Sequence, residues 1–335
     1  MLKILVLALL SVGPGAQWQT GSLQEAIETT GGTRPILLVV QAHWCSPCNV
    51  LAHEVLDAEP GHQLLNRAVG LKVDFDTPGG REVTERYGVL SLPTVLILRA
   101  DGTETGRVEG YRNAASFLAA LEQEFAGQNS TESLRQQLEA TPGDLDAMVS
   151  YAQSLLVHGE EDAAHTFLLK GMAAGGTIGA RSARIWGRWL VRVKQDGPRG
   201  AAHFLEWLRR YRGEAVEAEF RYWAAEALWL QGKREESIRL FDEWIARDPR
   251  SYQALISKVG FQVRHGSSSQ ECVMMAQAAM TLDPEQAWPH YLLAELRLRQ
   301  GDRAAAVAAI RRAVAMEPGK PIFLRFGRTR LGLSF

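Results

Sequence analysis

Apolar residues follow two different periods along this chain. From residue 17 to about residue 127, segments with helical spacing alternate with short apolar runs of strand length, and beyond about residue 129 only the helical spacing continues. The run PILLVVQ at residues 35–41 is typical of a central strand that is covered on both faces. The pattern therefore predicts an α/β unit followed by an all-α unit.

The first unit is predicted to contain helices and strands in mixed order. Ser22 is placed to cap a helix that starts with LQEAIETT, and Gly31 and Gly32 are placed to end it. The other predicted elements are a strand at 35–41, a helix from about 47 to 56, strands at 69–75, 94–99 and 104–110, and a helix at 114–125. Because a short turn separates the last two strands, they should form an antiparallel hairpin, which gives the sheet mixed pairing.

The second unit contains a repeat of about 34 residues, the length of a two-helix repeat. Glycines recur at 159, 197, 232, 266 and 301, and prolines at 249, 284 and 318. In such a repeat the glycine ends the first helix and the proline stops the second. Two copies carry small and apolar residues at equivalent positions: Ala225, Gly232, Ser237, Phe241, Trp244 and Pro249 in one, and Ala294, Gly301, Ala306, Ile310, Ala313 and Pro318 in the other.

These positions resemble those of tetratricopeptide repeat proteins over roughly residues 130–320. The resemblance implies a helical solenoid of about five repeats, of which the first two are less regular. Such arrays usually offer a concave groove to a peptide or protein, so the resemblance also implies a protein partner in the groove. The two patterns divide the chain into residues 17–127 and residues 128–335.

Composition excludes several classes of protein. The 335 residues include 37 basic and 38 acidic side chains, three cysteines and 46% apolar residues. A small domain stapled by disulfides needs a higher density of cysteine, and a nucleic-acid binder usually has a clear basic excess, so we expect no nucleic acid as a partner. The chain has the length and the apolar content of about two ordinary domains.

Residues 1–16, MLKILVLALLSVGPGA, have the features of a secretory signal peptide: a lysine, an apolar run and small residues at the end. The apolar run is shorter than the roughly 20 residues that cross a bilayer. We expect export to the periplasm or to the outside of the cell, with no stable membrane span once the signal is removed. The alternative is a first buried strand of a cytoplasmic protein.

The candidate chemistry lies in the segment WCSPC, residues 44–48, between a predicted strand and a predicted helix. A helix N-terminus carries partial positive charge and free N–H groups, which lower the pKa of a nearby thiol. Cys45 is therefore the predicted nucleophile, and Cys48, one turn further along, is predicted to resolve a mixed disulfide. Trp44 is predicted to cover this redox-active pair and to offer substrates an apolar surface.

A Cys-x-x-Cys segment also occurs in zinc sites, in haem attachment sites and as a purely structural disulfide. Zinc would need further ligands, but the third cysteine is distant, at Cys272, and no histidine pair has ligand spacing. Covalent haem attachment requires histidine where this chain has Asn49. We expect no metal and no cofactor, while the structural disulfide stays an open alternative. Cys272 itself is expected to be a buried packing residue.

A second segment, SLPT at residues 91–94, lies about 45 residues after the cysteines and directly before the predicted hairpin. With WCSPC it makes residues 17–127 resemble the thioredoxin superfamily, and they look closer to the periplasmic thioredoxin-like domain of bacterial thiol:disulfide interchange proteins than to cytosolic thioredoxin. The resemblance implies a thioredoxin fold in which Pro93 has a cis peptide bond and lies against the disulfide. Leu92 and Pro93 would then bind substrate through strand-like pairing.

One departure from the thioredoxin pattern concerns a buried aspartate six residues before the first cysteine, where this chain has Val39. In thioredoxins the aspartate accepts the proton of the resolving thiol, so water or another group must do so here. Lys72 matches the lysine beside that aspartate and, without this partner, is expected at the surface. His43, His53 and Glu54 lie near enough in sequence to assist, but a solvated or packing role is favoured for each.

The near-neutral total charge conceals two oppositely charged units. Residues 17–127 contain 8 basic and 14 acidic side chains, whereas residues 128–335 contain 28 and 24. Nine basic residues lie at 181–212, interleaved with three tryptophans. This mixture occurs on nucleic-acid-binding surfaces, but arginines on the outer faces of stacked helices, with the tryptophans turned inward, explain it equally well and are favoured.

The leading hypothesis is an exported thiol–disulfide oxidoreductase that acts on protein or peptide thiols and disulfides, with repeats that recruit its clients. The alternative is a holdase chaperone or assembly scaffold with little redox turnover, which some proteins that join a thioredoxin fold to repeats resemble. The intact WCSPC segment favours the first hypothesis.

Overall fold

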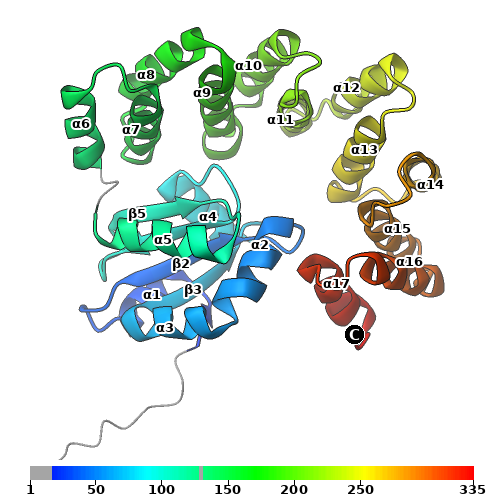
Figure 1. The fold of residues 1–335 in the computed structure, drawn as a ribbon, viewed down its shortest axis with the longest axis horizontal. Helices are drawn as coiled ribbons and strands as arrows, with labels where there is room; N and C mark the ends of the chain where they lie inside the picture. The colour runs from blue at the N-terminus through cyan, green and yellow to red at the C-terminus, as the bar shows by residue number, and fades with distance from the viewer. Residues whose placement is uncertain (1–16, 128–130) are drawn as a thin grey trace, which may run out of the picture.

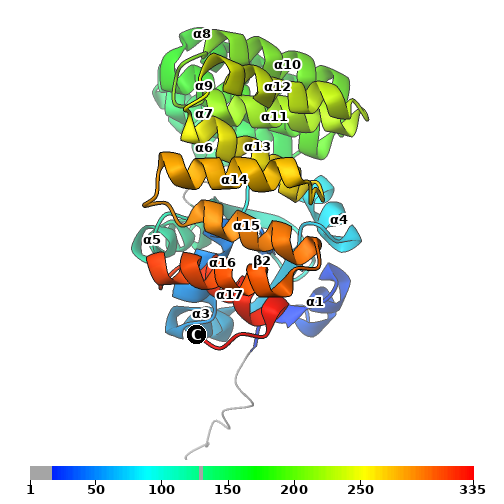
Figure 2. The same ribbon diagram turned by 90° about the vertical axis from the view of Figure 1, so that its right-hand side faces the viewer.

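The computed structural model describes residues 17–127 and 131–335 and has two parts (Figure 1). The predicted signal peptide, residues 1–16, lies outside the described residues. The first part is a five-stranded sheet with helices on both faces, and the second is an array of helices that arches over the first part and returns to it at the C-terminus (Figures 1 and 2). The structure thus has the predicted order of folds, an α/β thioredoxin fold followed by an all-α solenoid.

Five strands of the described residues form one sheet, in the order β1-β3-β2-β4-β5. They are β1 (Gln19–Thr20), β2 (Ile36–Gln41), β3 (Val69–Asp74), β4 (Thr94–Leu98) and β5 (Glu104–Glu109). β3 pairs in parallel with β1 and β2, and β4 pairs antiparallel with β2 and β5. The apolar run at 35–41 is the central strand, as predicted, because β2 is buried on both faces.

Helices cover both faces of this sheet. They are α1 (Leu23–Thr29), α2 (Ser46–Leu51) with the π-helical turn η1 (Ala52–Leu56), α3 (Glu59–Arg67), α4 (Pro78–Tyr87) and α5 (Ala114–Phe125). Residues of α1 and α4 pack on one face, and residues of α2, η1, α3 and α5 pack on the other. The predicted cap is confirmed, because the Ser22 hydroxyl accepts from the N–H of Glu25 and the Glu25 carboxylate accepts from the N–H of Ser22. In this arrangement the first turn of α2 lies next to the end of β2.

Twelve helices of the described residues make up the second part. The first is α6 (Thr131–Ala140) and the last is α17 (Pro321–Leu331). Between them lie five successive pairs: α7 (Leu145–Val157) with α8 (Glu161–Ala174), α9 (Gly176–Arg188) and its π-helical end η2 (Trp189–Val193) with α10 (Gly197–Arg210), α11 (Glu217–Leu230) with α12 (Arg234–Arg247), α13 (Tyr252–Arg264) with α14 (Gln270–Leu282), and α15 (Trp288–Arg299) with α16 (Arg303–Met316).

The repeat glycines end the first helix in four of these five pairs. They are Gly159, Gly232, Gly266 and Gly301, with φ between +75° and +85°. This left-handed conformation suits a glycine just beyond a helix. The prediction for Gly197 is wrong, because Gly197 starts α10 and the left-handed residue is Gln195, at φ +53°. The π-helical end η2 holds more residues per turn than an α-helix, so the chain leaves this helix in a different register.

The residues predicted to pack between paired helices are buried. Those with no exposed surface are Ala225, Ser237, Phe241, Ala294, Ala306, Ile310 and Ala313. The tryptophans of residues 181–212 are buried as well, as predicted: Trp186, Trp189 and Trp207 are 4–6% exposed. Small residues at these positions let the paired helices approach closely, which is how the repeats build a continuous core.

The concave side of the array contacts the first part along the loop before β4. Leu90 is buried in the same apolar cluster as Trp189 and Phe204 of the array. Gly88 makes this approach close, because a Cβ at this residue would lie 2.8 Å from the ring of Trp189. Arg192 of η2 donates a hydrogen bond of 3.0 Å to the carbonyl oxygen of Leu90. The two parts therefore share a buried interface.

The arginines of residues 181–212 are not all on outer faces, contrary to the prediction. Four of them recur every three or four residues along α9 and η2 and face the first part: Arg181, Arg184, Arg188 and Arg192. Residues at this spacing share one face of a helix, and here that face is the concave one. Others, such as Arg209 and Arg212, are exposed.

The last helix, α17, was not predicted from the sequence. It packs against α2 and so brings the end of the array back to the first part (Figure 1). Within the part of the chain that the structure describes, no helix combines the length and the apolarity needed to cross a bilayer.

Candidate active site

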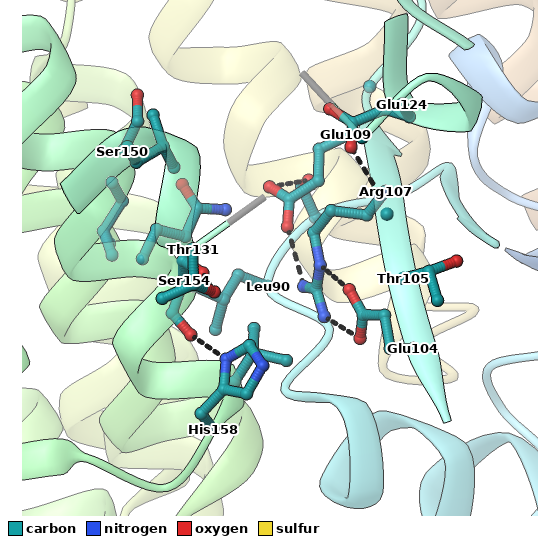
Figure 3. A pocket seen from close by; sticks show the side chains of 18 of the residues that line it. Leu90, Glu104, Thr105, Arg107, Glu109, Glu124, Thr131, Ser150, Ser154 and His158 are labelled. Carbon is teal, nitrogen blue, oxygen red and sulfur yellow. Dashed lines mark hydrogen bonds and ion pairs between the residues drawn. The ribbon is translucent and has the colours of Figure 1, made fainter. Parts of the chain in front are cut away.

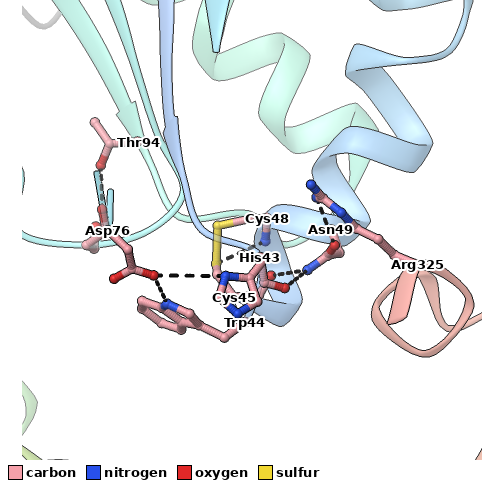
Figure 4. The surroundings of a disulfide bond; sticks show 9 residues. His43, Trp44, Cys45, Cys48, Asn49, Asp76, Thr94 and Arg325 are labelled. Carbon is pink, nitrogen blue, oxygen red and sulfur yellow. Dashed lines mark hydrogen bonds and ion pairs between the residues drawn. A yellow bond between two sulfur atoms is a disulfide. The ribbon is translucent and has the colours of Figure 1, made fainter. Parts of the chain in front are cut away.

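The two cysteines of WCSPC lie where β2 leads into α2, and a disulfide joins them (Figure 4). Cys45 is the N-cap of α2 and Cys48 lies in its first turn. The backbone N–H of Cys48 donates to the Sγ of Cys45 at 3.2 Å. Pro47 is tolerated between them because the first turn of a helix does not need its N–H. The sulfur of Cys45 thus faces the positive end of the helix.

Apolar side chains surround the disulfide. The two cysteines are 5% and 2% exposed, and Trp44, Phe75 and Leu92 pack against them. The peptide bond between Leu92 and Pro93 is cis, as the resemblance implies, and Pro93 is buried. The fold thus brings Trp44 and Leu92 to the disulfide, while substrate binding by Trp44, Leu92 and Pro93 stays a prediction.

Asn49 holds the backbone of the active-site loop. This side chain is 3% exposed, and its Nδ2 donates to the carbonyl oxygens of Cys45 at 2.7 Å and of His43 at 3.1 Å. Its Oδ1 accepts a hydrogen bond of 3.3 Å from Arg325 of α17 (Figure 4). The last helix therefore contacts the residue that orients Cys45.

The ring of Trp44 contacts both the loop that follows β3 and the array. Its Nε1 donates to the carboxylate of Asp76 at 2.5 Å, and the guanidinium carbon of Arg264 lies 3.5 Å from the ring centroid. Arg264 in turn pairs with Glu226 at 3.4 Å. A desolvated cation–π contact contributes about 2 kcal/mol. The array thus covers part of the surface that Trp44 was predicted to offer to substrates.

Val39 takes the place of the buried aspartate of thioredoxins. It is fully buried and packs in an apolar cluster with Leu51 and Val95. The side chain of Lys72 is 14% exposed, but its Nζ bonds at 2.5 Å to Asp57, whose side chain is 60% exposed, so the charged end lies at the surface as expected. Asp57 directly follows η1. The carboxylate that pairs with Lys72 therefore comes from a different element than the buried aspartate of the thioredoxin pattern.

The three polar residues near the cysteines in sequence, His43, His53 and Glu54, have exposed side chains, in keeping with a solvated role. His43 Nδ1 lies 4.0 Å from the carboxylate of Asp76. Glu54 accepts a hydrogen bond from the hydroxyl of Tyr111. The carboxylates of Asp76 and Glu54 therefore have partners other than the cysteines.

Cys272 is buried in α14, as expected of a packing residue. Its sulfur donates to the Oε1 of Gln262 at 3.2 Å. Among the described residues, no three His, Cys, Asp or Glu side chains are grouped so that they could hold a metal ion.

Sequence reasoning missed several residues around the disulfide: Asn49, Phe75, Asp76, Arg264 and Arg325. Phe75 and Asp76 directly follow β3, beside the end of β2, and ligand sites of α/β sheets lie at the carboxyl ends of parallel strands. That position was a usable signal. The sequence around Arg264 and Arg325 does not indicate a contact with the active site, because only the curvature of the array brings these residues to the first part.

Comparison with known proteins agrees with this geometry. A family model of the thioredoxin-like domain matches residues 23–125, and one of the tetratricopeptide repeat matches residues 190–252 and 291–326. A thioredoxin of Mycolicibacterium smegmatis is 30% identical over 96 residues, which are 28% of this chain and 81% of that protein. The chain belongs to the thioredoxin family. Both resemblances predicted from the sequence are thus confirmed.

Other members of the thioredoxin family match the same part of the chain. A thioredoxin of Alicyclobacillus acidocaldarius is 29% identical over 100 residues, which are 30% of this chain and 88% of that protein. The thiol:disulfide interchange protein DsbD of Neisseria meningitidis is 28% identical over 109 residues, which are 31% of this chain but 18% of DsbD. At the level of the family, these matches support a thiol–disulfide oxidoreductase, and the repeats indicate contact with other proteins.

Proposed function

We propose that this protein exchanges thiols and disulfides with protein or peptide clients through Cys45 and Cys48. The observation that carries the proposal is the position of Cys45 at the N-cap of α2, where the N–H of Cys48 donates to its sulfur. Both features favour the thiolate, which is the form that attacks a disulfide. Trp44, Leu92 and Pro93 are the groups proposed to contact the client.

The proposed exchange has two balanced steps. The Cys45 thiolate attacks one sulfur of a client disulfide, so a mixed disulfide forms and the other client sulfur leaves as a thiolate, which takes up a proton. The Cys48 thiol then loses its proton and attacks the Cys45 sulfur, which releases the first client sulfur and forms the Cys45–Cys48 disulfide. The client gains two electrons and the protein loses two. The reverse steps oxidise a client dithiol, and the reduction potentials of the partners set the direction.

The resolving step lacks the carboxylate that serves thioredoxins. Val39 fills that position within an apolar cluster. In this proposal water accepts the proton of Cys48.

Recruitment and location complete the proposal. The repeats are proposed to hold protein clients, because the concave side of the array faces the part of the chain that bears the disulfide (Figure 1). Export to the periplasm or the exterior is proposed from the signal-like residues 1–16, and it would place the cysteine pair where disulfides persist.

Replacing the nucleophile tests the proposal directly. Cys45→Ser is expected to abolish reduction of insulin by a dithiol, because a hydroxyl does not form the attacking anion at neutral pH. Cys272→Ser is the matched control, since it removes the buried cysteine of α14, and it should retain full activity. Full activity of Cys45→Ser would contradict the proposal.

Replacing the resolving residue tests whether the clients are proteins. Cys48→Ser should leave clients attached to Cys45 as mixed disulfides, because the second step is lost. Non-reducing gels of protein taken from its native compartment detect these adducts. Their absence would argue against exchange with protein clients.

The N-terminus of the mature protein tests export. Sequencing of protein purified from its source should begin near residue 17. Retention of Met1 would refute the export part of the proposal and leave the exchange chemistry unaffected.

A further inference from the structure

The repeat array reaches the active-site loop, residues 43–49, at separate places rather than along its whole concave side. Between β5 and the helices α7 and α9 lies a cavity of about 940 Å³, which is not lined by either cysteine of the disulfide (Figure 3). On its β5 wall Arg107 pairs with Glu104 and Glu109 of the same strand. Arginines of two other helices, α13 and α17, reach the active-site loop instead.

The side-chain amide of Asn49 joins two points of this loop. Its Nδ2 carries two hydrogens and has two acceptors, the carbonyl oxygens of His43 and Cys45. These carbonyl groups lie on either side of Trp44 in the sequence. The backbone N–H of Asn49 also donates to the carbonyl oxygen of Cys45, at 3.1 Å. Asn49 therefore fixes the segment that carries the Cys45 side chain.

One orientation of the Asn49 amide satisfies its surroundings. In the flipped orientation Oδ1 would face two carbonyl oxygens, which have no hydrogen to donate. In the observed orientation Oδ1 accepts a hydrogen bond of 3.3 Å from the guanidinium of Arg325, a group that can only donate. Asn49 is 3% exposed, so a flipped amide would leave buried polar groups unpaired. Arg325 thus stabilises the orientation in which Asn49 holds Cys45.

Helix α17 is anchored in the array and presents Arg325 to α2. Ile322, Phe323 and Phe326 are buried in the apolar cluster of the last helices of the array. Arg325 is exposed and lies beside Asn49 (Figure 4). Within residues 17–127 and 131–335 no carboxylate pairs with its guanidinium, so Asn49 is its polar partner.

The position of Cys45 decides how well its thiolate is stabilised. Its Sγ lies 3.2 Å from the N–H of Cys48, which donates to it. A hydrogen bond to an anion is stronger than one to a neutral acceptor, so this donor lowers the pKa of the Cys45 thiol. A loop without the Asn49 bonds would visit positions in which the sulfur is farther from this N–H. The fraction of thiolate near neutral pH therefore depends on Asn49.

We infer that Arg325 of the repeat array is a positioning residue for Cys45 and acts through Asn49. The guanidinium orients the amide, the amide holds the loop, and the loop places the sulfur at the N–H of Cys48. The inference rests on the proposed function, in which Cys45 is the nucleophile. It adds that the last helix of the array sets the reactivity of this thiol.

The pH dependence of alkylation by iodoacetamide tests this inference. The reagent is the full chain, reduced, with Cys48→Ser and Cys272→Ser, which leave Cys45 as the single thiol and keep the N–H of residue 48. The thiolate displaces iodide and forms a thioether, so the rate follows the thiolate fraction. Arg325→Met keeps an unbranched side chain but removes the charge and the donors. It should shift the profile to higher pH and lower the rate at pH 7 about threefold.

Further variants of the same protein assign the effect. Arg328→Met is the matched control, since it removes the same charge from an exposed position of α17, and it should leave the profile unchanged. Arg325→Lys retains a charged donor and should keep most of the rate. Asn49→Leu fills similar space without a donor and should lower the rate about tenfold. Adding Arg325→Met to Asn49→Leu should have no further effect, because the arginine acts through the amide.

Two results would overturn the inference and leave the proposed function intact. One is a profile that Arg325→Met does not move. The other is an equal effect of Arg325→Met with and without Asn49, which would mean that the charge acts on Cys45 directly, and added salt would weaken such an effect. The proposed function fails separately: a protein with all its cysteines that does not reduce insulin refutes it, whatever the alkylation profile.

Discussion

The thioredoxin part and the repeat array contribute to the same site in different ways. The thioredoxin part supplies the disulfide-bonded cysteine pair from one short segment at the start of α2. The array supplies Arg192, Arg264 and Arg325 from η2, α13 and α17, which reach the first part because the helices curve around it (Figure 1). The cysteine pair is thus positioned by local structure in this protein, whereas its surroundings are formed by long-range packing.

The contacts between the two parts also differ in kind. At Leu90 the contact is apolar and buried, and full burial of such a side chain contributes about 1.5–3 kcal/mol. At Trp44 the contact is a cation on an aromatic ring, which contributes up to about 2 kcal/mol. We therefore expect the contact at Leu90 to hold the two parts together and the contact at Trp44 to shape the surface beside the disulfide.

The largest expected effect tests whether the two parts are coupled. Phe204 is fully buried in the cluster that also contains Leu90, so Phe204→Ala should lower the free energy of unfolding by about 3–5 kcal/mol. Because Leu90 shares this cluster, β2 should lose protection against hydrogen exchange together with the array. Leu169→Ala, at an exposed position of α8, is the control and should change stability by less than about 0.5 kcal/mol. Unchanged exchange in β2 would show that the parts unfold independently.

A glycine pair tests how tightly the two parts are packed. Gly88 has φ +57°, and an added Cβ would lie 2.8 Å from Trp189, whereas Gly31 has φ +59° and nothing within 4 Å of its added Cβ. Both alanine substitutions incur the strain of the left-handed conformation, but only Gly88→Ala adds a clash. Urea unfolding should show Gly88→Ala to be about 1–3 kcal/mol more destabilising than Gly31→Ala. Equal effects would mean that Trp189 yields without cost.

A double-mutant cycle tests the contact beside the disulfide. The guanidinium of Arg264 lies 3.5 Å from the ring centroid of Trp44. Urea unfolding of Arg264→Gln, Trp44→Ala and the double variant should give a coupling energy of about 1–2 kcal/mol. A coupling energy near zero would contradict a role of the array in holding Trp44.

The smallest expected effect concerns acid stability of the array. His203 Nε2 donates to the carbonyl oxygen of Ala183 at 2.7 Å, and burial lowers the pKa of His203 below its usual value. As the pH falls below about 6.5, the unfolded chain binds a proton that the folded array resists, so stability decreases with acid and is unaffected above that pH. His203→Gln should flatten this decrease in melting temperature. An unchanged pH dependence would show that His203 ionises alike in both states.

Much of the fold followed from local pattern. The predicted limits of β2, β3, β4 and β5 agree with the structure to within one residue, and those of α5 agree at both ends. Periodicity and turn residues act over a few positions, so they are readable in a single sequence. The error at the arginines of α9 concerns which surroundings a side chain meets. Spacing identifies a shared face of a helix but not what lies opposite that face.

Four features could be predicted from the sequence alone, because each depends on neighbouring or regularly spaced residues. They are the cysteine pair, its position at a helix N-terminus, the Leu92–Pro93 segment and the array of repeats. Three other features depend on the tertiary structure. They are the contact of Arg264 with Trp44, the contact of α17 with Asn49 and the cavity between α9 and β5. The physical reason is that small rotations between successive repeats add up to the curvature of the array, and no short segment of sequence specifies that sum.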